Sequence, residues 1–401
     1  MRLHRNLVLA VIDALYVIFN EGVFANKAIE KTLKKDVKWG SRDRGFIAES
    51  IYDIVRNRRL LTYVSNIKPH YDKKNIWKLF ASWRVINDYR LSEWPEFETT
   101  PVRKIKSRHA DASKDRRLRE SIPDWLDDLC FSELGNSWDR EVSSLNEMAK
   151  VVLRVNTTKT SISSLRSDLF KEGIESYEIE AYKSALVLKE RKNVFSTECF
   201  KKGYFEVQDA SSQLVSEFLD IKPKMNVVDA CAGAGGKTLH ISNIMDNKGN
   251  IIAMDIDKYK LFELKRRAKR NGAFNINIRC ITSSKVVKRM DGCADRLLLD
   301  VPCSGLGVLK RNPDIKWKLT RESLDELKGK QEYILSKYSK MLKIEGKMVY
   351  ATCSILPSEN ELQIQKFISQ HDNFELIKER KISPYKTGFD GFYIAVLKRI
   401  G

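Results

Sequence analysis

Two of the seven cysteines follow apolar runs that end in turn residues. Cys303 lies in the stretch DVPCSG at 300–305, and Cys353 lies in ATCS at 351–354. We predict that each run is a strand of one parallel sheet, because ligands bind where the carboxyl ends of such strands meet. A single buried cysteine is most often a small hydrophobic residue. Two cysteines in the same position after two strands instead favour a pair of thiols that lie close together in a ligand crevice.

Paired thiols suit the transfer of a methyl group to carbon. Carbon 5 of a pyrimidine is a poor nucleophile, but a thiolate that adds to carbon 6 converts the ring to an enamine-like species that attacks an electrophilic methyl group. The carbon-5 proton must then leave before the thiol can be eliminated. A substrate that accepts the methyl group on oxygen or on an amine would need no covalent step. The two cysteines therefore favour a pyrimidine substrate.

The segment VVDACAGAGGKT at 227–238 predicts a strand, a tight loop and a helix. A P-loop needs glycine at position 231, where this chain has Cys231, and a dinucleotide site needs a third glycine that is missing here. S-adenosylmethionine fits better, because Asp229 ends the first strand and glycines let the backbone approach the methionine part of that ligand. Asp255 ends the second strand, where it could hold the ribose hydroxyls. A glycine turn without a ligand is the remaining alternative.

Length and charge limit the architectures and the partners that are possible for the protein. The chain has 401 residues, of which 42% are hydrophobic and 31% charged, as expected for two or three folded domains. Its net charge of +19 favours a polyanionic partner, with nucleic acid as the first candidate and merely solvated lysines as the alternative. The scattered cysteines have no C-x-x-C spacing, so we expect reduced thiols, no metal site and a cytoplasmic location. No uncharged run approaches the ~18–20 residues that cross a bilayer, so no membrane partner is expected.

Hydrophobic periodicity predicts helices in the first third of the chain, over 8–18 and over about 44–64. The second of these helices carries Arg56, Arg58 and Arg59 on its other side. The block at 101–120 holds eight basic residues against three acidic ones, which predicts an exposed, mobile connection that touches phosphates.

A strand at 151–156 and a helix at 161–172 predict a small α/β unit that runs to about residue 207. After residue 225, apolar runs alternate with helical segments, which predicts a mostly parallel, doubly wound sheet. The expected strands cover 226–230, 251–256, 276–280, 296–301, 347–352 and 392–398.

The chain from Gln208 onward resembles the RNA 5-methylcytosine methyltransferases of the RsmB/Sun family. The matching motifs are DACAGAGGKT at 229–238, LLLDVPCSGLGVLKRNPDIKW at 297–317, MVYATCSILPSENE at 348–361 and DGFYIA at 390–395. More loosely, residues 43–61 resemble the NusB-like helical RNA-binding domain of the RsmB branch.

This resemblance implies an α/β fold with a Rossmann-like class I methyltransferase sheet. A small RRM-like α/β unit and an all-α NusB-like domain would precede the sheet. We expect the NusB-like domain at 1–140, the connecting unit at 141–207 and the S-adenosylmethionine-dependent domain at 208–401.

The resemblance also implies roles for individual residues. Cys353 would be the nucleophile on carbon 6 and Cys303 would assist product release, the reverse of the DNA cytosine-5 enzymes. Asp300 would reach the cytosine ring, and Lys237 would lie near the reacting centre, where its charge favours a thiolate. The residues expected to line the cofactor site are Cys231, Ala232, Gly233, Ala234, Gly235, Gly236, Lys237, Asp255, Thr282 and Asp300.

At two places this chain departs from the family pattern. Ala234 stands where the family commonly has proline, a difference that a small residue should accommodate. Thr282 or Ser283 stands where family members usually carry an acid near the adenine.

We therefore expect an S-adenosylmethionine-dependent enzyme that forms 5-methylcytosine in 16S ribosomal RNA through a covalent cysteine–carbon 6 adduct. The enzyme would act as a monomer on a cytosine that is unpaired or flipped out of its helix. A transfer RNA target is the alternative within the family. The alternative from another class is a non-catalytic RNA-binding or assembly factor, against which the presence of both cysteines argues.

Overall fold

The computed structural model describes residues 3–401 and divides the chain into two compact units. The first unit runs to Glu147 and also includes Leu309–Leu319. The second comprises Met148–Val308 and Thr320–Gly401. The segment Leu309–Leu319 therefore folds with the N-terminal helices, although in sequence it closely follows Cys303. None of the helices within residues 3–401 is long and apolar enough to span a membrane.

The first unit is helical. Its helices are α1 (Arg5–Asn20), α2 (Ala25–Leu33), α3 (Ser41–Arg56), α4 (Arg58–Ser65), α5 (Lys73–Ile86), α6 (Pro95–Glu98), α7 (Val102–Ala112), α8 (Arg116–Arg119), α9 (Asp124–Leu134), α10 (Trp138–Asn146) and α17 (Ile315–Lys318), with a 3₁₀ turn, η1 (Gly135–Ser137). The predicted helix over 8–18 is confirmed as the middle of α1. The predicted helix over 44–64 is two helices, α3 and α4, which are separated at Asn57.

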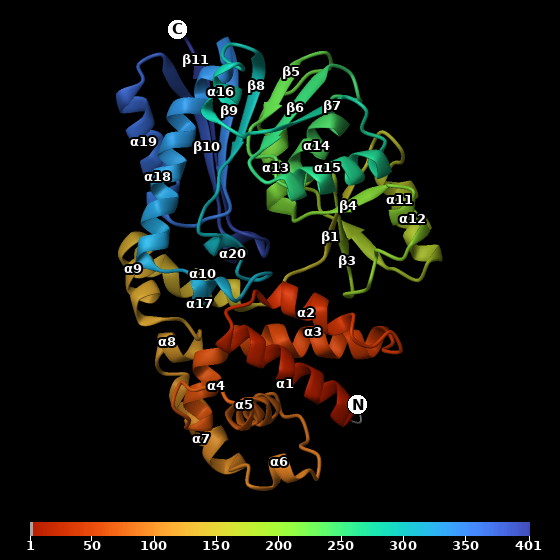
Figure 1. The fold of residues 1–401 in the computed structure, drawn as a ribbon, viewed down its shortest axis with the longest axis vertical. Coiled ribbons are helices and arrows are strands. Elements are labelled where there is room, and N and C mark those ends of the chain that lie inside the picture. The colour runs from red at the N-terminus through yellow and green to blue at the C-terminus, as the bar shows by residue number, and fades with distance from the viewer. Residues whose placement is uncertain (1–2) are drawn as a thin grey trace. The chain divides into compact units, whose positions relative to one another are not determined.

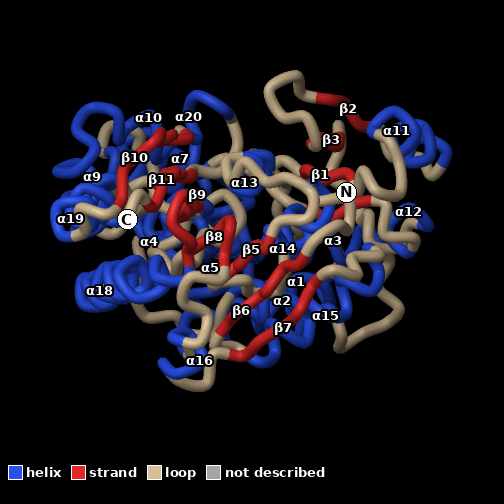
Figure 2. The backbone as a smooth tube through the Cα atoms, turned by 90° about the horizontal axis from the view of Figure 1, so that it is seen from above, coloured by secondary structure: helices blue, strands red, loops and turns tan. Residues whose placement is uncertain are grey.

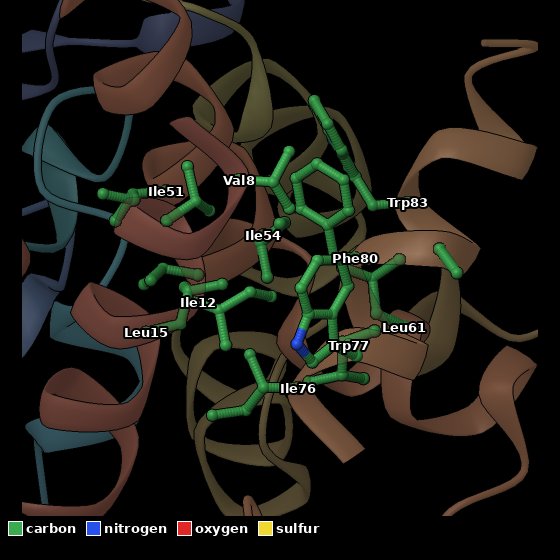
Figure 3. Packing of buried hydrophobic residues seen from close by; sticks show 14 of the residues in the cluster. Val8, Ile12, Leu15, Ile51, Ile54, Leu61, Ile76, Trp77, Phe80 and Trp83 are labelled. Atoms are coloured by element: carbon green, nitrogen blue, oxygen red, sulfur yellow. The ribbon is translucent and has the colours of Figure 1, made fainter. Parts of the chain in front are cut away.

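The core of this unit forms where the apolar faces of α1, α3, α4 and α5 meet. Ile12 and Leu15 of α1 point toward the same cluster as Ile54 of α3 and Phe80 of α5 (Figure 3). These four side chains are at most 1% exposed. Burial of a side chain of this size contributes about 1.5–3 kcal/mol, so this cluster is the main source of stability for the helical unit.

The basic block at 101–120 differs from its prediction. It folds as α7 and α8 instead of a mobile connection, and the arginines of α8 (Arg116, Arg117 and Arg119) are paired with acids. Arg116 and Arg117 both donate to the carboxylate of Asp127, which is 1% exposed, at 2.9 and 3.2 Å. Burial is the largest single influence and opposes ionisation, but the hydrogen bonds from Arg116, Trp138 and Arg117 and the charge of Arg116 together outweigh it and hold the pKa of Asp127 below its ordinary value. These arginines bind the chain's own carboxylates, so they are not a free phosphate-binding surface.

The arginines at the junction of α3 and α4 also have internal partners. Arg56 is buried and donates to the main-chain oxygens of Leu309 and Lys310 at 3.2 and 3.0 Å. The guanidinium of Arg58 lies 4.4 Å from the ring centroid of Trp317. Both arginines thus fasten the segment 309–319 to the helical unit, a role that helix periodicity did not reveal.

The second unit begins with the predicted small α/β part, which is confirmed. Its antiparallel sheet has the order β2-β3-β1-β4. The elements are β1 (Val152–Val155), α11 (Ile162–Lys171), β2 (Ser176–Glu178), β3 (Ala185–Leu188), α12 (Glu198–Lys201) and β4 (Phe205–Val207). Helix α11 lies beside β2 (Figure 2), and Leu165 and Leu169 of this helix pack against Leu153 of β1.

The larger sheet has seven strands in the order β10-β11-β9-β8-β5-β6-β7. The strands are β5 (Asn226–Asp229), β6 (Asn250–Asp255), β7 (Ile276–Cys280), β8 (Ala294–Asp300), β9 (Leu342–Thr352), β10 (Phe374–Ile382) and β11 (Phe392–Arg399). The five strands from β9 to β7 pair in parallel, whereas β11 pairs antiparallel with both β9 and β10. The predicted doubly wound sheet is confirmed, and β10 is an additional strand.

Helices cover both faces of this sheet. They are α13 (Ala210–Glu217), α14 (Gly236–Ile244), α15 (Lys258–Asn271), α16 (Ser284–Lys288), α18 (Arg321–Tyr338) and α19 (Glu361–Gln370). The short helix α20 (Pro384–Thr387) lies in the connection between β10 and β11. Alternate strand residues belong to opposite layers: Leu298 packs in the layer of α13 and α14, and Leu299 in the layer of α18 and α19 (Figure 1). Connecting loops follow the carboxyl ends of the parallel strands. The predicted site residues lie at these strand ends and in the loops that follow them.

Candidate active site

The two cysteines of the predicted pair lie in contact. Strands β8 and β9 are parallel neighbours with Asp300 opposite Ala351, so the loop after each strand begins at the same edge of the sheet. The sulfur atoms of Cys303 and Cys353 are 3.4 Å apart. The hydrogen bond with Cys353, together with burial, raises the pKa of the Cys303 thiol well above its ordinary value. Cys303 therefore keeps its proton and can donate it toward the sulfur of Cys353.

Main-chain contacts fix the loops that carry the thiols. The amide of Gly307 donates to the carbonyl of Cys353 at 2.9 Å, and the amide of Gly391 donates to the carbonyl of Gly307 at 2.8 Å. A β-carbon at Gly307 would overlap the carbonyl of Gly391, so only glycine allows this approach. The Pro-Cys, Thr-Cys and DGFYIA motifs thus meet at one place in the fold.

An ion pair lies beside the thiols. Asp300 is the last residue of β8, and its carboxylate accepts a hydrogen bond from the ammonium of Lys237 in α14 at 2.6 Å. Burial is the largest single influence and opposes the charge on Lys237, but the charge and hydrogen bond of Asp300, together with smaller contributions from Cys353 and Asp229, outweigh it and raise the pKa of the ammonium above its ordinary value. Lys237 therefore stays protonated and supplies a fixed positive charge near the two sulfurs.

The glycine-rich loop follows β5, as predicted. Gly233 and Gly235 have φ angles of +52° and +86°, which L side chains rarely adopt. The amide of Gly233 donates to the Asp255 carboxylate, at the end of β6, at 2.8 Å. The same carboxylate accepts the amide of Asp257 at 2.9 Å, and its remaining lone pairs are available to a diol.

Asp229 at the end of β5 is also suited to a ligand. Burial raises its pKa to about 7, and one of its oxygens accepts a hydrogen bond from the Thr238 hydroxyl at 2.7 Å. The other oxygen is buried without a hydrogen-bond partner. The open glycine turn, the orphan carboxylate oxygen and Asp255 therefore fit the methionine and ribose groups of S-adenosylmethionine.

The remaining predicted residues lie along the same edge of the sheet. Cys231 and Ala232 lie two and three residues after Asp229, and burial raises the pKa of the Cys231 thiol well above its ordinary value. Strand register places Cys280 opposite Asp255, so exposed Thr282 lies two residues beyond the neighbouring strand end. Within residues 3–401 no group of three His, Cys, Asp or Glu side chains could hold a metal ion.

Sequence reasoning missed two arginines that hold the glycine loop from outside. Arg154 in β1, which is 2% exposed, donates to the carbonyl of Gly236 at 2.5 Å, and Arg267 in α15 donates to the carbonyl of Ala234 at 2.7 Å. Arg267 also pairs with buried Glu206 at 2.9 Å. An arginine between apolar residues of a predicted strand was the available signal, because such a charge requires a partner.

Glycine substitutions should separate backbone strain from steric overlap in this loop. A β-carbon at Gly235 would lie 2.6 Å from Cγ of Leu264, whereas one at Gly233 would meet no atom within 4 Å. We expect Gly233→Ala to cost about 1–2 kcal/mol of unfolding free energy from left-handed backbone alone. Gly235→Ala should cost more and should weaken S-adenosylmethionine binding at least about tenfold, since a loop shift that costs 1.4 kcal/mol has that effect.

Urea unfolding and titration calorimetry would measure these two effects. Gly329→Ala is the matched control, because Gly329 lies in α18 with open space around its α-carbon. This control should be neutral or slightly stabilising, by up to about 1 kcal/mol. Equal affinity for S-adenosylmethionine in Gly235→Ala and the control would contradict the assignment of the loop.

A seven-stranded sheet with this order, a glycine loop after β5 and acids at the ends of β5 and β6 define a class I methyltransferase. The family model described as 16S rRNA methyltransferase RsmB/F matches residues 216–398, and a model for the ferredoxin-like domain of such enzymes matches residues 122–195. The chain belongs to the RsmB/F family of 16S rRNA methyltransferases.

Individual relatives agree with this assignment. The chain is 28% identical to the probable ribosomal RNA small subunit methyltransferase B of Bacillus subtilis, over 97% of this chain and 98% of the relative. It is 33% identical to the Synechocystis protein of the same name, over 70% of this chain and 67% of the relative. A solved methyltransferase homolog from Pyrococcus horikoshii superposes with a TM-score of 0.64 at 28% identity, over 71% of this chain and 98% of that one. The chain is thus an rRNA methyltransferase, and its family implies S-adenosylmethionine as the methyl donor.

Proposed function

We propose that the chain forms 5-methylcytosine in 16S ribosomal RNA through a covalent bond between Cys353 and carbon 6 of the target cytosine. The observation that carries this proposal is the pair of thiols 3.4 Å apart at the ends of β8 and β9. Methylation of an oxygen or an exocyclic amine needs no thiol at the reacting centre. A non-catalytic binding protein would need neither cysteine in this position.

The reaction begins when the Cys353 thiolate adds to carbon 6 and pushes an electron pair toward carbon 5. S-adenosylmethionine, when bound, would supply an electrophilic methyl group to carbon 5, and its sulfonium sulfur would leave as a neutral thioether. A base removes the carbon-5 proton, the double bond re-forms, and the Cys353 sulfur leaves. We assign assistance of this last step to Cys303, because its sulfur is in contact with the leaving sulfur.

The Lys237–Asp300 pair orients and polarises the reacting groups. The ammonium of Lys237 stabilises negative charge that develops on the reacting groups near it. The carboxylate of Asp300 can accept a hydrogen bond from the cytosine amino group, which distinguishes cytosine from uracil. Asp229, Asp255 and the backbone of 231–236 would hold the methyl donor.

Ribosomal RNA is the substrate that the family implies, and the chain's net charge of +19 suits a polyanion. The target base must leave its stack to bring carbon 6 to a sulfur atom at the end of a strand. Which cytosine is methylated depends on RNA contacts outside the thiol site. Transfer RNA is the second candidate substrate, because its chemistry at the base would be identical.

Bisulfite sequencing of ribosomal and transfer RNA from cells with and without the gene would test the proposal. We expect one or a few cytosines of 16S ribosomal RNA to lose protection from deamination when the gene is absent, and to regain it when the gene is restored. Loss of protection only in transfer RNA would move the substrate to that class. Unchanged protection in both, with purified enzyme unable to methylate cytosine, would refute the proposed reaction.

A further inference from the structure

One buried carboxylate joins the two loops that carry the thiols. Glu359 ends the 3₁₀ turn η4 (Pro357–Glu359), six residues after Cys353, and is 0% exposed. Its carboxylate accepts hydrogen bonds from the amide of Ser304 at 2.8 Å and from the hydroxyls of both Ser304 and Ser354. The side-chain amide of Gln331 in α18 also donates to it, at 3.0 Å.

The two serines make this arrangement specific to the thiols. Ser304 directly follows Cys303 and Ser354 directly follows Cys353, and their hydroxyl oxygens are 3.2 Å apart. Each hydroxyl therefore has the other hydroxyl and the same carboxylate within hydrogen-bond distance. A change in the position of Glu359 would move both cysteines, because each is one residue away from a bound serine.

A buried carboxylate is costly unless several donors replace its water shell. Glu359 has four such donors, and three of them come from the residues that follow the thiols. An apolar side chain could fill the same volume without this cost but would not fix the two loops in register with each other. The arrangement therefore has a use beyond packing.

We propose that Glu359 is a positioning residue that holds Cys303 and Cys353 in contact. This inference rests on the proposed function of the two thiols and extends it to a residue that touches neither the RNA nor the methyl donor. We call the hydrogen bonds from Ser304, Ser354 and Gln331 to Glu359 the Glu359 clamp. Because catalysis depends on placement to within about 1 Å, loss of this clamp should lower the methylation rate about 100-fold.

The charge of Glu359 acts on the thiols as well. After the hydrogen bond with Cys353 and burial, the negative charges of Cys353 and Glu359 are further causes that raise the pKa of Cys303. The phenol of Tyr350 also faces this region, and it donates to the carbonyl of Glu359 at 2.7 Å. Lys237 and Asp300 form their own pair. Removal of the Glu359 charge should therefore let Cys303 ionise at lower pH.

Oxidative cross-linking measures the distance between the thiols without any need for methylation. A diazenedicarboxamide oxidant takes two electrons and two protons from Cys303 and Cys353, which form a disulfide while the oxidant becomes a hydrazine. Peptide mass spectrometry identifies the 303–353 disulfide among the other cysteines. We expect Glu359→Gln to slow this reaction at least tenfold relative to the unchanged protein.

Glu361→Gln is the matched control, because it makes the same chemical change two residues away in a glutamate that pairs with Lys381. This control should cross-link at the unchanged rate. A second measurement uses iodoacetamide alkylation of Cys303 in a Cys353→Ala background, where one thiol titrates alone. Glu359→Gln should shift the midpoint of alkylation to lower pH, a change that a purely structural role would not produce.

The proposal would be overturned if folded Glu359→Gln cross-linked at the unchanged rate and kept the unchanged alkylation midpoint. If that variant does not fold, Ser304→Ala and Ser354→Ala can replace it, because each removes one hydroxyl contact to Glu359. Each should slow cross-linking. The proposal would equally be overturned if neither serine variant slowed cross-linking. Methylation by Cys353→Ala would instead refute the thiol mechanism. The cross-linking experiment would still test the position of the two thiols, because it does not depend on methylation.

Discussion

Cys353→Ala is expected to lose methylation completely and to form no covalent complex with RNA. Without the attacking sulfur, carbon 6 gains no bond, and carbon 5 never becomes nucleophilic enough to attack the methyl group. The fold should survive, because the change removes one sulfur atom from a loop that main-chain hydrogen bonds hold. Binding of S-adenosylmethionine should therefore be unchanged in calorimetry.

Cys303→Ala is expected to behave differently, because Cys353 can still attack and the methyl group can still be transferred. Elimination should become slow, so a protein–RNA complex that survives denaturing gel electrophoresis should accumulate. The double variant must form no complex, since a release defect needs the first bond. Cys293→Ala, which changes a cysteine that follows α16 outside the thiol site, should methylate normally.

The opposite pattern would assign the chemistry to the other thiol. A complex trapped only by Cys353→Ala would make Cys303 the nucleophile, as in the DNA cytosine-5 enzymes. Full activity in both single variants would leave the sulfur contact without a catalytic use. These outcomes separate on one gel, and the methylation assay distinguishes a slow release from a missing attack.

The thiol site could be predicted from sequence because its geometry follows from parallel strands. Residues that end neighbouring parallel strands must meet at one edge, so the positions of Cys303 and Cys353 after two apolar runs were sufficient. The same logic brought Asp229 and Asp255 to the glycine loop. Strand ends alone could not predict the role of Glu359. A glutamate in a short turn resembles a surface residue until the serines that donate hydrogen bonds to it are known.

Charged segments were the hardest to interpret from sequence alone. Strand β10 was missed because seven of its nine residues are exposed, and charged side chains on an edge strand hide its strand character. The block at 101–120 was interpreted as a phosphate-binding connection because its carboxylate partner Asp127 lies just outside it. A count of charges does not show whether a cation faces water or a buried carboxylate, because that depends on the fold.

The segment 309–319 shows the same limit most strongly. Lys316 is 1% exposed, and its ammonium donates to the carbonyls of Arg56 and Glu120 and to the side-chain oxygen of Asn146, at 2.9, 3.1 and 3.0 Å. Burial lowers the pKa of this lysine well below its ordinary value. In sequence it is one of several basic residues in a methyltransferase motif, yet in the fold it joins α3, the residue after α8 and α10 through a single side chain.

Lys316→Met should therefore destabilise the helical unit by about 3 kcal/mol, because methionine fills the space but takes the ammonium donor away from the carbonyl of Arg56 and the side-chain oxygen of Asn146. The carbonyl of Glu120 keeps the side-chain amide of Asn146 as a donor at 2.8 Å. All seven tryptophans lie in this unit, so their fluorescence during urea unfolding reports on it alone. Lys104→Met, at an exposed position of α7, is the matched control and should change stability by less than about 0.5 kcal/mol. An unchanged unfolding midpoint in Lys316→Met would show that the acceptors that lose the ammonium find other donors.

The pH dependence of the same comparison tests the direction of the Lys316 pKa. A lysine in the unfolded chain has a pKa of about 10.4. Folded Lys316 has a lower pKa and releases its proton at lower pH. At pH values between the folded and the unfolded pKa, the unfolded chain therefore binds more protons than the folded one. The unfolding free energy of the unchanged protein should rise with pH across that window, relative to Lys316→Met, in which position 316 does not titrate. The contribution should be lost again as the pH falls through the folded pKa. A stability difference that shrinks as the pH approaches about 10 would mean that the buried ammonium is held in its charged form, with a raised pKa.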